Sequence, residues 1–214
     1  MTATTHPATP DDAPFLAWVM QEAARSHLPI GVWDLAFPGP EPERLEQLAA
    51  CIQTDPVHFG HWSRFLIAEV DDRPAAALSA YENRAHGESH LGRALARGLT
   101  RLGWSGEQLM ELRDRIGVFD TPGCPTPDGV WIIEWVATRP DQRGLGLVRQ
   151  LLEEILDAGR KAGFTRSQIG ILIGNDAAQR TYERAGFELI DEYRHPEFER
   201  ALGSPGMARL QREL

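Results

Sequence analysis

The chain has 214 residues, of which 42% are apolar, and it carries a formal net charge of −9 at neutral pH. This apolar content suffices for a packed core and excludes a disordered chain. The negative charge argues against a nucleic-acid partner, because such a partner is held through its phosphates. An anionic small molecule stays open, since local fields outweigh the net charge.

The sequence also bears on location. It contains no apolar run of 18 residues, so we expect no transmembrane helix and no membrane partner. Residues 1–15 lack the basic region and the apolar core of a signal peptide. Cys51 and Cys124 are too few for a disulfide framework. We therefore expect a cytoplasmic protein with reduced thiols, folded as one domain over residues 1–214.

The first elements are a helix, a loop and a second helix. Thr9 and the two acids after Pro10 are typical of a helix start. The loop at 28–40 is broken by Pro and Gly, yet it carries Trp33 and Phe37. We interpret it as a lid packed on the core, with a wall of the substrate pocket as the alternative. A helix over 41–52 follows.

Residues 65–82 alternate like a hairpin, and residues 84–128 then interrupt the strand pattern as a helical insertion. Two stripes run along the insertion at helical spacing. The apolar stripe is Leu91, Leu95, Leu99 and Leu102, and the basic stripe is Arg93, Arg97 and Arg101. We interpret the arginines as a solvated helix face rather than a binding patch.

Strands and helices alternate in the last part of the chain. The expected order is a strand at 130–138, a helix at 145–162, a strand at 167–173, a helix at 175–185 and a strand at 187–194. This alternation predicts parallel strands joined by crossover helices. The tail has room for one last short strand. Residues 197–210 either close the acceptor side or form a homodimer contact, and the sequence does not choose between them.

A glycine-rich turn joins the strand at 130–138 to its helix. Gly144 and Gly146 let the backbone approach a ligand closely, and the helix start offers unpaired N–H groups to an anion. Arg143 adds a cation able to hold phosphate with two donors. The P-loop pattern and the third glycine of a dinucleotide turn are both absent. Taken alone, the turn favours a diphosphate site no more than a tight turn without a ligand.

A second motif follows from Asn175 to Phe187. Asn175 can cap a helix, and Ala178 and Tyr182 lie on one face of it. The run Arg143-Gly144-Leu145-Gly146-Leu147-Val148 resembles the acyl-CoA diphosphate signature Arg/Gln-x-x-Gly-x-Gly/Ala of the GNAT N-acetyltransferase superfamily. Asn175-x-x-Ala178-x-x-x-Tyr182-x-x-x-Gly186-Phe187 is similar to the second signature of that superfamily. One departure is Val148, where the family has Gly or Ala.

The resemblance implies an α/β (α+β) fold: a mixed, mostly antiparallel twisted sheet, splayed at its centre, flanked by helices, with the insertion between the third and fourth strands. It also implies acetyl-CoA as cosubstrate and no metal. The residues implied to bind the cofactor are Val136, Ala137 and Thr138 for the pantetheine arm, Arg143, Gly144, Leu145, Gly146, Leu147 and Val148 for the diphosphate, and Asn175, Ala178 and Tyr182 for the opposite wall.

Glu134 interrupts an otherwise apolar strand. By alternation it shares one face with Val136 and Thr138, while Ile133, Trp135 and Ala137 take the other. Burial raises the pKa of a carboxylate and makes it a better base, so we predict Glu134 as the general base. The alternative is a structural carboxylate paired with an arginine from the insertion. As base, its replacement by Gln is expected to lower turnover most at low pH. The resemblance implies Tyr182 as the general acid for the leaving thiolate.

Two functions remain open. The favoured one is an acyl-CoA-dependent N-acyltransferase that passes acetyl directly to an amine, either a small molecule or a peptide. The alternative is an acyl-CoA-binding sensor with little or no turnover, because a fold does not determine a function. The histidine pairs, His58 with His61 and His86 with His90, lack further ligands in a matching pattern, so we interpret them as surface residues.

Overall fold

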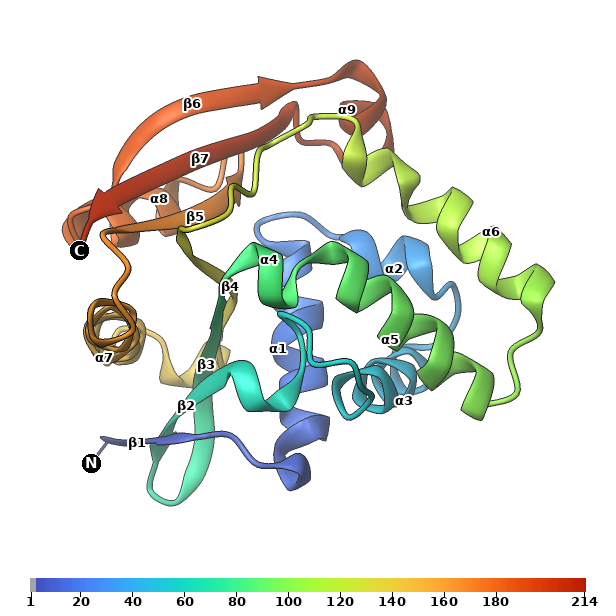
Figure 1. The fold of residues 1–214 in the computed structure, drawn as a ribbon, viewed down its shortest axis with the longest axis horizontal. Helices are drawn as coiled ribbons and strands as arrows, with labels where there is room; N and C mark the ends of the chain where they lie inside the picture. The colour runs from blue at the N-terminus through green and yellow to red at the C-terminus, as the bar shows by residue number, and fades with distance from the viewer. Residues whose placement is uncertain (1–2) are drawn as a thin grey trace.

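The computed structural model describes residues 3–214. Within them, seven strands form one sheet in the order β1-β2-β3-β4-β5-β7-β6 (Figure 1). The strands are β1 (Ala3–Pro7), β2 (Phe65–Val70), β3 (Arg73–Tyr81), β4 (Trp131–Thr138), β5 (Arg166–Leu172), β6 (Glu188–Arg194) and β7 (Gly206–Glu213). The helices are α1 (Ala13–Arg25), α2 (Val32–Ala36), α3 (Glu41–Ile52), α4 (Asn83–His86), α5 (Glu88–Arg101), α6 (Gly106–Ile116), α7 (Leu147–Lys161), α8 (Asp176–Arg184) and α9 (Pro196–Leu202).

The sheet is splayed at its centre. All neighbouring strands pair antiparallel except β4 and β5, which are parallel. Their pairing covers only Trp131–Ile133 on β4 and Ser167–Ile169 on β5, after which the two strands separate. The predicted mixed, mostly antiparallel and splayed sheet is thereby confirmed. The separation leaves backbone groups of both strands without a strand partner at the centre of the molecule.

Two apolar cores lie on opposite faces of the sheet. On one face, α7 packs over β2, β3 and β4 through Leu147, Leu151 and Leu152. On the other face, α1 contacts β3 and β4, and α3 and α5 pack outside it (Figure 1). Gly159 permits the first contact, because an added Cβ would lie 2.7 Å from the Trp131 ring.

The helical insertion lies between β3 and β4, as predicted, and consists of α4, α5 and α6. Leu95 and Leu99 are buried against α3, whereas Leu102 is 43% exposed because it follows the end of α5. The three arginines of the basic stripe are exposed, as expected of a solvated helix face.

The loop at 28–40 contains α2 and packs on the core. Trp33 and Phe37 are both buried, and Phe37 meets Trp104 of the insertion edge to face at 5.8 Å. As the interpretation of this loop as a packed lid requires, the side chains of Trp33 and Phe37 are buried in the core.

The topology after β5 differs from the prediction. The strands β5 and β6 are not neighbours, because β7 lies between them and pairs antiparallel with both. The expected last short strand is eight residues long. Because both are antiparallel to β7, β5 and β6 still run in the same direction and are joined by α8, so only the expected pairing of these two strands is wrong. The order of connections cannot anticipate a later strand that inserts between two earlier ones.

The interpretation of His58 and His61 as surface residues is wrong. His58 is completely buried and His61 is 5% exposed. The ring of His58 accepts a hydrogen bond from Gly60 N at Nδ1, so its Nε2 carries the proton and donates to the Cys51 carbonyl at 3.2 Å. Burial lowers the pKa of His58 to about 4. His86 and His90 are half-buried, and within residues 3–214 no cluster of histidine, cysteine and acidic side chains is arranged to hold a metal.

The neutral His58 predicts acid-sensitive stability. Its pKa in the unfolded chain is 6.5, so between pH 6.5 and about 4 the unfolded state binds the extra proton. We expect this residue to lower the free energy of unfolding by up to about 1.4 kcal/mol for each pH unit of acidification in that range. Urea unfolding at pH 4 to 7 checks this: His58→Asn should flatten the dependence, and an unchanged dependence in that variant would contradict the prediction.

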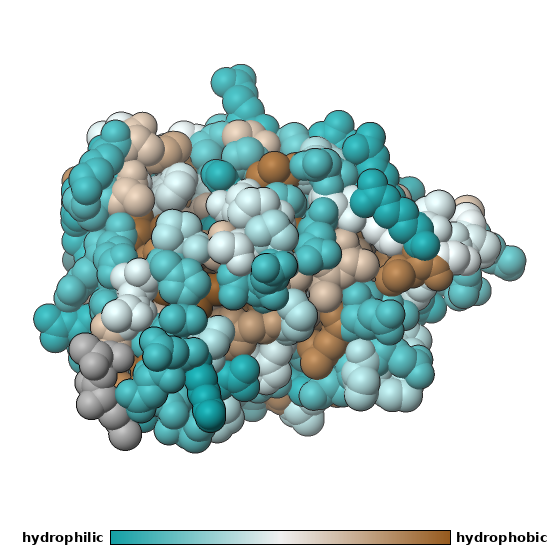
Figure 2. Space-filling model, turned by 90° about the horizontal axis from the view of Figure 1, so that it is seen from below, coloured by the Kyte–Doolittle hydropathy of each residue, from teal (hydrophilic) through white to brown (hydrophobic). Residues whose placement is uncertain are grey.

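The face shown in Figure 2 is mostly hydrophilic, with hydrophobic residues in small separate patches. Within residues 3–214, no helix combines the length and the apolarity needed to cross a bilayer.

Candidate active site

A cavity of about 1480 Å³ opens where β4 and β5 separate. It is lined by residues of β4, β5, α7 and α8 and of the C-terminal end of α1. Most of the predicted site residues line it: Glu134, Val136, Ala137, Thr138, Arg143, Gly144, Gly146, Leu147, Val148, Asn175, Ala178 and Tyr182. The structure thus brings together the strand, the turn and the second motif around one space.

The glycine turn is open toward this space. Gly144 has φ 84° and Gly146 has φ 77°, and an added Cβ would meet no atom within 4 Å at either position. Gly146 is the N-cap of α7, so the first amides of that helix lie beside it. The turn therefore combines an accessible backbone with the positive end of a 15-residue helix.

Leu145 does not line the cavity and is 48% exposed. Val148 lines the cavity, but its side chain also packs against the core beneath α7. A valine in place of Gly or Ala is accommodated there because it is partly turned into the protein.

The amide of Asn175 is already engaged. Its Oδ1 accepts a hydrogen bond from Ala178 N at 3.1 Å, which is the predicted helix cap. Its Nδ2 donates to Ser26 Oγ at 2.6 Å, a contact that the sequence did not predict. Asn175 thus shapes the cavity wall through two protein contacts.

Strand β4 does not alternate as predicted. Ser79 is opposite Glu134 and Ala77 is opposite Ala137, so Leu78 faces both Trp135 and Val136 in a bulge. Trp135 has φ 52°. Because the bulge adds one residue to β4, the side chains after it point to the opposite face of the sheet from the one predicted. Val136 packs into the same core as Ile133, while Trp135 and Ala137 pack against the α1 side. The expected shared face of Glu134 and Val136 is therefore wrong.

Glu134 lines the cavity with a strongly perturbed carboxyl. Burial and, to a smaller extent, the charge of Glu88 raise its pKa to about 8. The alternative of an ion pair with an arginine is wrong: within residues 3–214 Glu134 forms no salt bridge, and the insertion places Glu88, at the start of α5, near it instead. A carboxyl with a pKa near neutrality in a cavity is suited to proton transfer.

Tyr182 lies on the opposite wall, buried on α8 beside Phe187. Burial and the charge of Glu134 raise the pKa of its phenol well above the ordinary value. The hydroxyl therefore keeps its proton at neutral pH and can only donate it. Glu134 and Tyr182 line the same cavity.

Several lining residues had no signal in the sequence. The end of α1 contributes Glu22, and the segment that follows it contributes Ser26 and His27. Arg160 comes from α7 and Arg212 from β7. These residues come from elements far apart in the chain, and no motif or spacing marks them.

Comparisons with known proteins agree with this geometry. The model of the family described as "Acetyltransferase (GNAT) family" matches residues 30–187. A search of curated proteins finds no match. Three solved structures share the fold. An N-acetyltransferase from Staphylococcus aureus Mu50 has a TM-score of 0.71 and 18% identity, with 98% of this chain and 100% of that chain covered.

The second, yncA from Salmonella typhimurium with its cofactor acetyl-CoA, has a TM-score of 0.55 and 16% identity, with 100% and 95% covered. The third, a Drosophila melanogaster polyamine N-acetyltransferase that forms N-acetylagmatine, has a TM-score of 0.57 and 15% identity, with all of both chains covered. At these identities the structures show a common fold. The family match spans well over half of the chain, which therefore belongs to the acetyltransferase (GNAT) family of acetyl-CoA-dependent enzymes.

Proposed function

We propose that the protein transfers acetyl from acetyl-CoA directly to an amine, with Glu134 as general base and Tyr182 as general acid. The observation that carries this proposal is that two residues lining one cavity have complementary protonation states: one can accept a proton and the other can donate one. Glu134 has a pKa of about 8, so it can take up a proton near neutrality, and Tyr182 stays protonated. A protein that only binds acyl-CoA needs neither group.

The cofactor site fits a diphosphate and an extended arm. Acetyl-CoA supplies a thioester-activated acetyl group. Arg143, Gly144, Gly146 and the amides of Leu147 and Val148 would hold its diphosphate at the start of α7. The edge of β4 from Val136 to Thr138, which has separated from β5, would pair with the pantetheine arm as with an added strand.

The residues divide the proton transfers between them. An alkylammonium has a pKa of about 10 and cannot attack until it loses a proton, which Glu134 accepts. The amide of Val136, at the bulge, is a candidate donor to the carbonyl oxygen as it becomes negative. Tyr182 gives its proton to the thiolate that leaves. In becoming an amide the ammonium loses two protons. Glu134 accepts the first and later releases it to water, and the second, lost from nitrogen as the C–S bond breaks, replaces the proton that Tyr182 gives to the thiolate.

The acceptor is an amine of a small molecule or a peptide. The charge of Glu88 acts on this end of the cavity, and Glu134 adds a second negative charge when it is deprotonated, which favours a cationic amine. The Drosophila melanogaster enzyme that shares this fold is a polyamine N-acetyltransferase that forms N-acetylagmatine.

A thiol-release assay with acetyl-CoA against a panel of small amines and basic peptides tests the proposal. Acceptor-dependent release supports transfer. Tight binding of acetyl-CoA by calorimetry without release for any amine would instead favour the sensor.

The glycine turn predicts a binding effect that is separable from stability. Gly146→Ala forces a side chain into a left-handed conformation, as does Gly203→Ala at the end of α9, where φ is 86° and space is also open. Each is expected to lower the free energy of unfolding by about 1 kcal/mol. Calorimetry should show that only Gly146→Ala weakens acetyl-CoA binding, by about tenfold or more. Equal affinities in the two variants would contradict the diphosphate assignment.

A further inference from the structure

The segment between α1 and α2 crosses from one half of the splayed sheet to the other. We call residues 26–31 the strap. Ser26 and His27 line the same cavity as Glu134. Beyond the cavity, Leu28 packs with Leu172 at the end of β5 and with Phe198 of α9. The strap thus starts on the α1 half of the molecule and rests on the β5 half.

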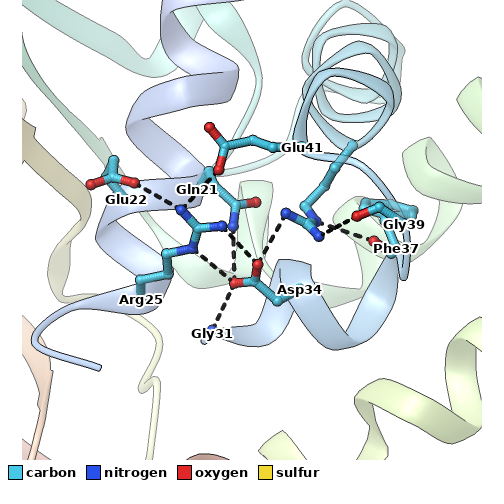
Figure 3. A network of polar contacts seen from close by, with 9 residues as sticks. Gln21, Glu22, Arg25, Gly31, Asp34, Phe37, Gly39 and Glu41 are labelled. Atoms are coloured by element: carbon cyan, nitrogen blue, oxygen red, sulfur yellow. Dashed lines mark hydrogen bonds and ion pairs between the residues drawn. The ribbon is translucent and has the colours of Figure 1, made fainter. Parts of the chain in front are cut away.

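A buried ion network holds the α2 side of the strap in place (Figure 3). Asp34 accepts hydrogen bonds from Gly31 N at 2.8 Å and from Arg25 Nη2 at 2.9 Å, and it pairs with Arg44 at 3.0 Å. Burial alone would raise the pKa of Asp34, but the bonds from Arg25 lower it overall. Gly31 also packs so tightly on α1 that an added Cβ would lie 2.4 Å from the Ala24 carbonyl. This end of the strap is rigid.

The other end is held across the cavity by one polar contact. Asn175 Nδ2 donates to Ser26 Oγ at 2.6 Å, joining residues 149 positions apart. His27 lies beside Gly174, the residue before Asn175: a Cβ added at Gly174 would lie 3.1 Å from His27 Nε2. Two consecutive strap residues therefore meet two consecutive residues of the β5–α8 turn, beside the wall that carries Tyr182.

Ser26 adopts this position at a conformational cost. It has φ 59° and ψ −112°, a region that residues with a side chain rarely enter. Glycine would adopt it without strain, but glycine has no hydroxyl. At this position the chain has a residue with a strained backbone whose hydroxyl accepts the hydrogen bond from Asn175. Such strain beside the cavity indicates that this hydrogen bond has a role that outweighs its cost in stability.

We propose that Ser26 is a positioning residue for acetyl transfer: by bonding to Asn175 it holds the strap across the cavity, where it orders the acceptor beside Glu134 and keeps water from the thioester. The proposal rests on the transfer reaction proposed above. Asn175 caps α8 through its Oδ1, a hydrogen bond that does not involve Ser26. A change at Ser26 can therefore alter the position of the strap without removing this cap.

Ser26→Ala and Ser26→Gly form a matched pair for the test. Both remove the hydroxyl, but only glycine relieves the strain at φ 59°. We expect both to lower kcat/KM for the amine about three- to tenfold, the effect of one lost hydrogen bond, and both to raise amine-independent hydrolysis of acetyl-CoA. Calorimetry should give acetyl-CoA affinities within about twofold of the wild type, because neither change touches the groups proposed to hold the diphosphate and the pantetheine arm. Ser26→Gly should melt no lower than Ser26→Ala.

A double-mutant cycle then tests the route of the effect. Asn175→Ser can still cap α8 but is too short to reach Ser26. If Ser26 acts through Asn175, Ser26→Ala should cause no further loss in the Asn175→Ser background. Additive losses would overturn the proposal, as would a Ser26→Gly variant with wild-type transfer and hydrolysis. If the wild type itself transfers acetyl to no amine, the proposed function fails. If it transfers and Ser26→Ala is unaffected, only the role of Ser26 fails.

Discussion

Glu134→Gln is expected to lower kcat by about a hundredfold or more at pH 8, the usual effect of removing a general base. The substitution keeps the shape of the side chain but removes the proton acceptor. Affinity for acetyl-CoA should stay near that of the wild type, because the diphosphate site that we propose lies at the start of α7, away from Glu134 in the chain. Steady-state kinetics with a responsive amine, paired with calorimetry, measures both quantities.

The pKa of about 8 decides where the loss is largest. Below that pH most Glu134 is protonated in the wild type and cannot act as base, so wild type and variant converge as the pH falls. The ratio of their kcat/KM values should grow about tenfold per unit from pH 6 to 8 and then level off. This reverses the expectation from sequence that the loss is largest at low pH, because that expectation did not include so high a pKa. A ratio independent of pH would remove Glu134 from the mechanism.

Two further measurements isolate the cause of the raised pKa. Glu88→Gln removes the second cause of the raised pKa, so the midpoint of the pH profile should move to lower pH while burial keeps it above the ordinary value for a glutamate.

The pH dependence of stability checks the pKa of Glu134 without catalysis. Because the folded state holds this proton more tightly than the unfolded state, the free energy of unfolding should fall as the pH rises from 4.5 to about 8. Glu134→Gln should lack this part of the dependence.

Tyr182→Phe is expected to reduce kcat by about ten- to a thousandfold. The change removes only the hydroxyl and keeps the ring that packs beside Phe187. Because the raised pKa keeps the phenol protonated across the neutral range, the factor should be nearly constant from pH 6 to 9. Rapid-quench measurement of the transfer step, with a good and a poor thiol leaving group, should show the larger loss for the poor one.

Tyr193→Phe is the matched control for this prediction. Tyr193 lies on β6, and its hydroxyl donates to Asp191 at 2.9 Å rather than lining the cavity. It should leave kcat unchanged. If Tyr182→Phe also left kcat unchanged, Tyr182 would have only a packing role.

Much of the fold and of the candidate site could be predicted because it depends on local backbone preferences. Gly144 and Gly146 mark a turn through their positive φ values, and Asn175 marks a helix start through its side-chain cap. Apolar spacing over a few residues predicted α7 and its buried face. These properties are determined by neighbours along the chain, so the sequence alone contains them.

The remaining features depend on contacts between distant segments. The insertion of β7 between β5 and β6 is set by strand pairing, and the bulge at Trp135 by the register of β4 on β3. The approach of Glu88 to Glu134 and the bond from Asn175 to Ser26 join elements that no local period relates. Sequence by itself marked the residues that we propose bind a coenzyme and those that we propose transfer protons. Only the tertiary structure decided how the surroundings of these residues shift their pKa values and which partners they contact, because burial and long-range contacts exist only after the chain has folded.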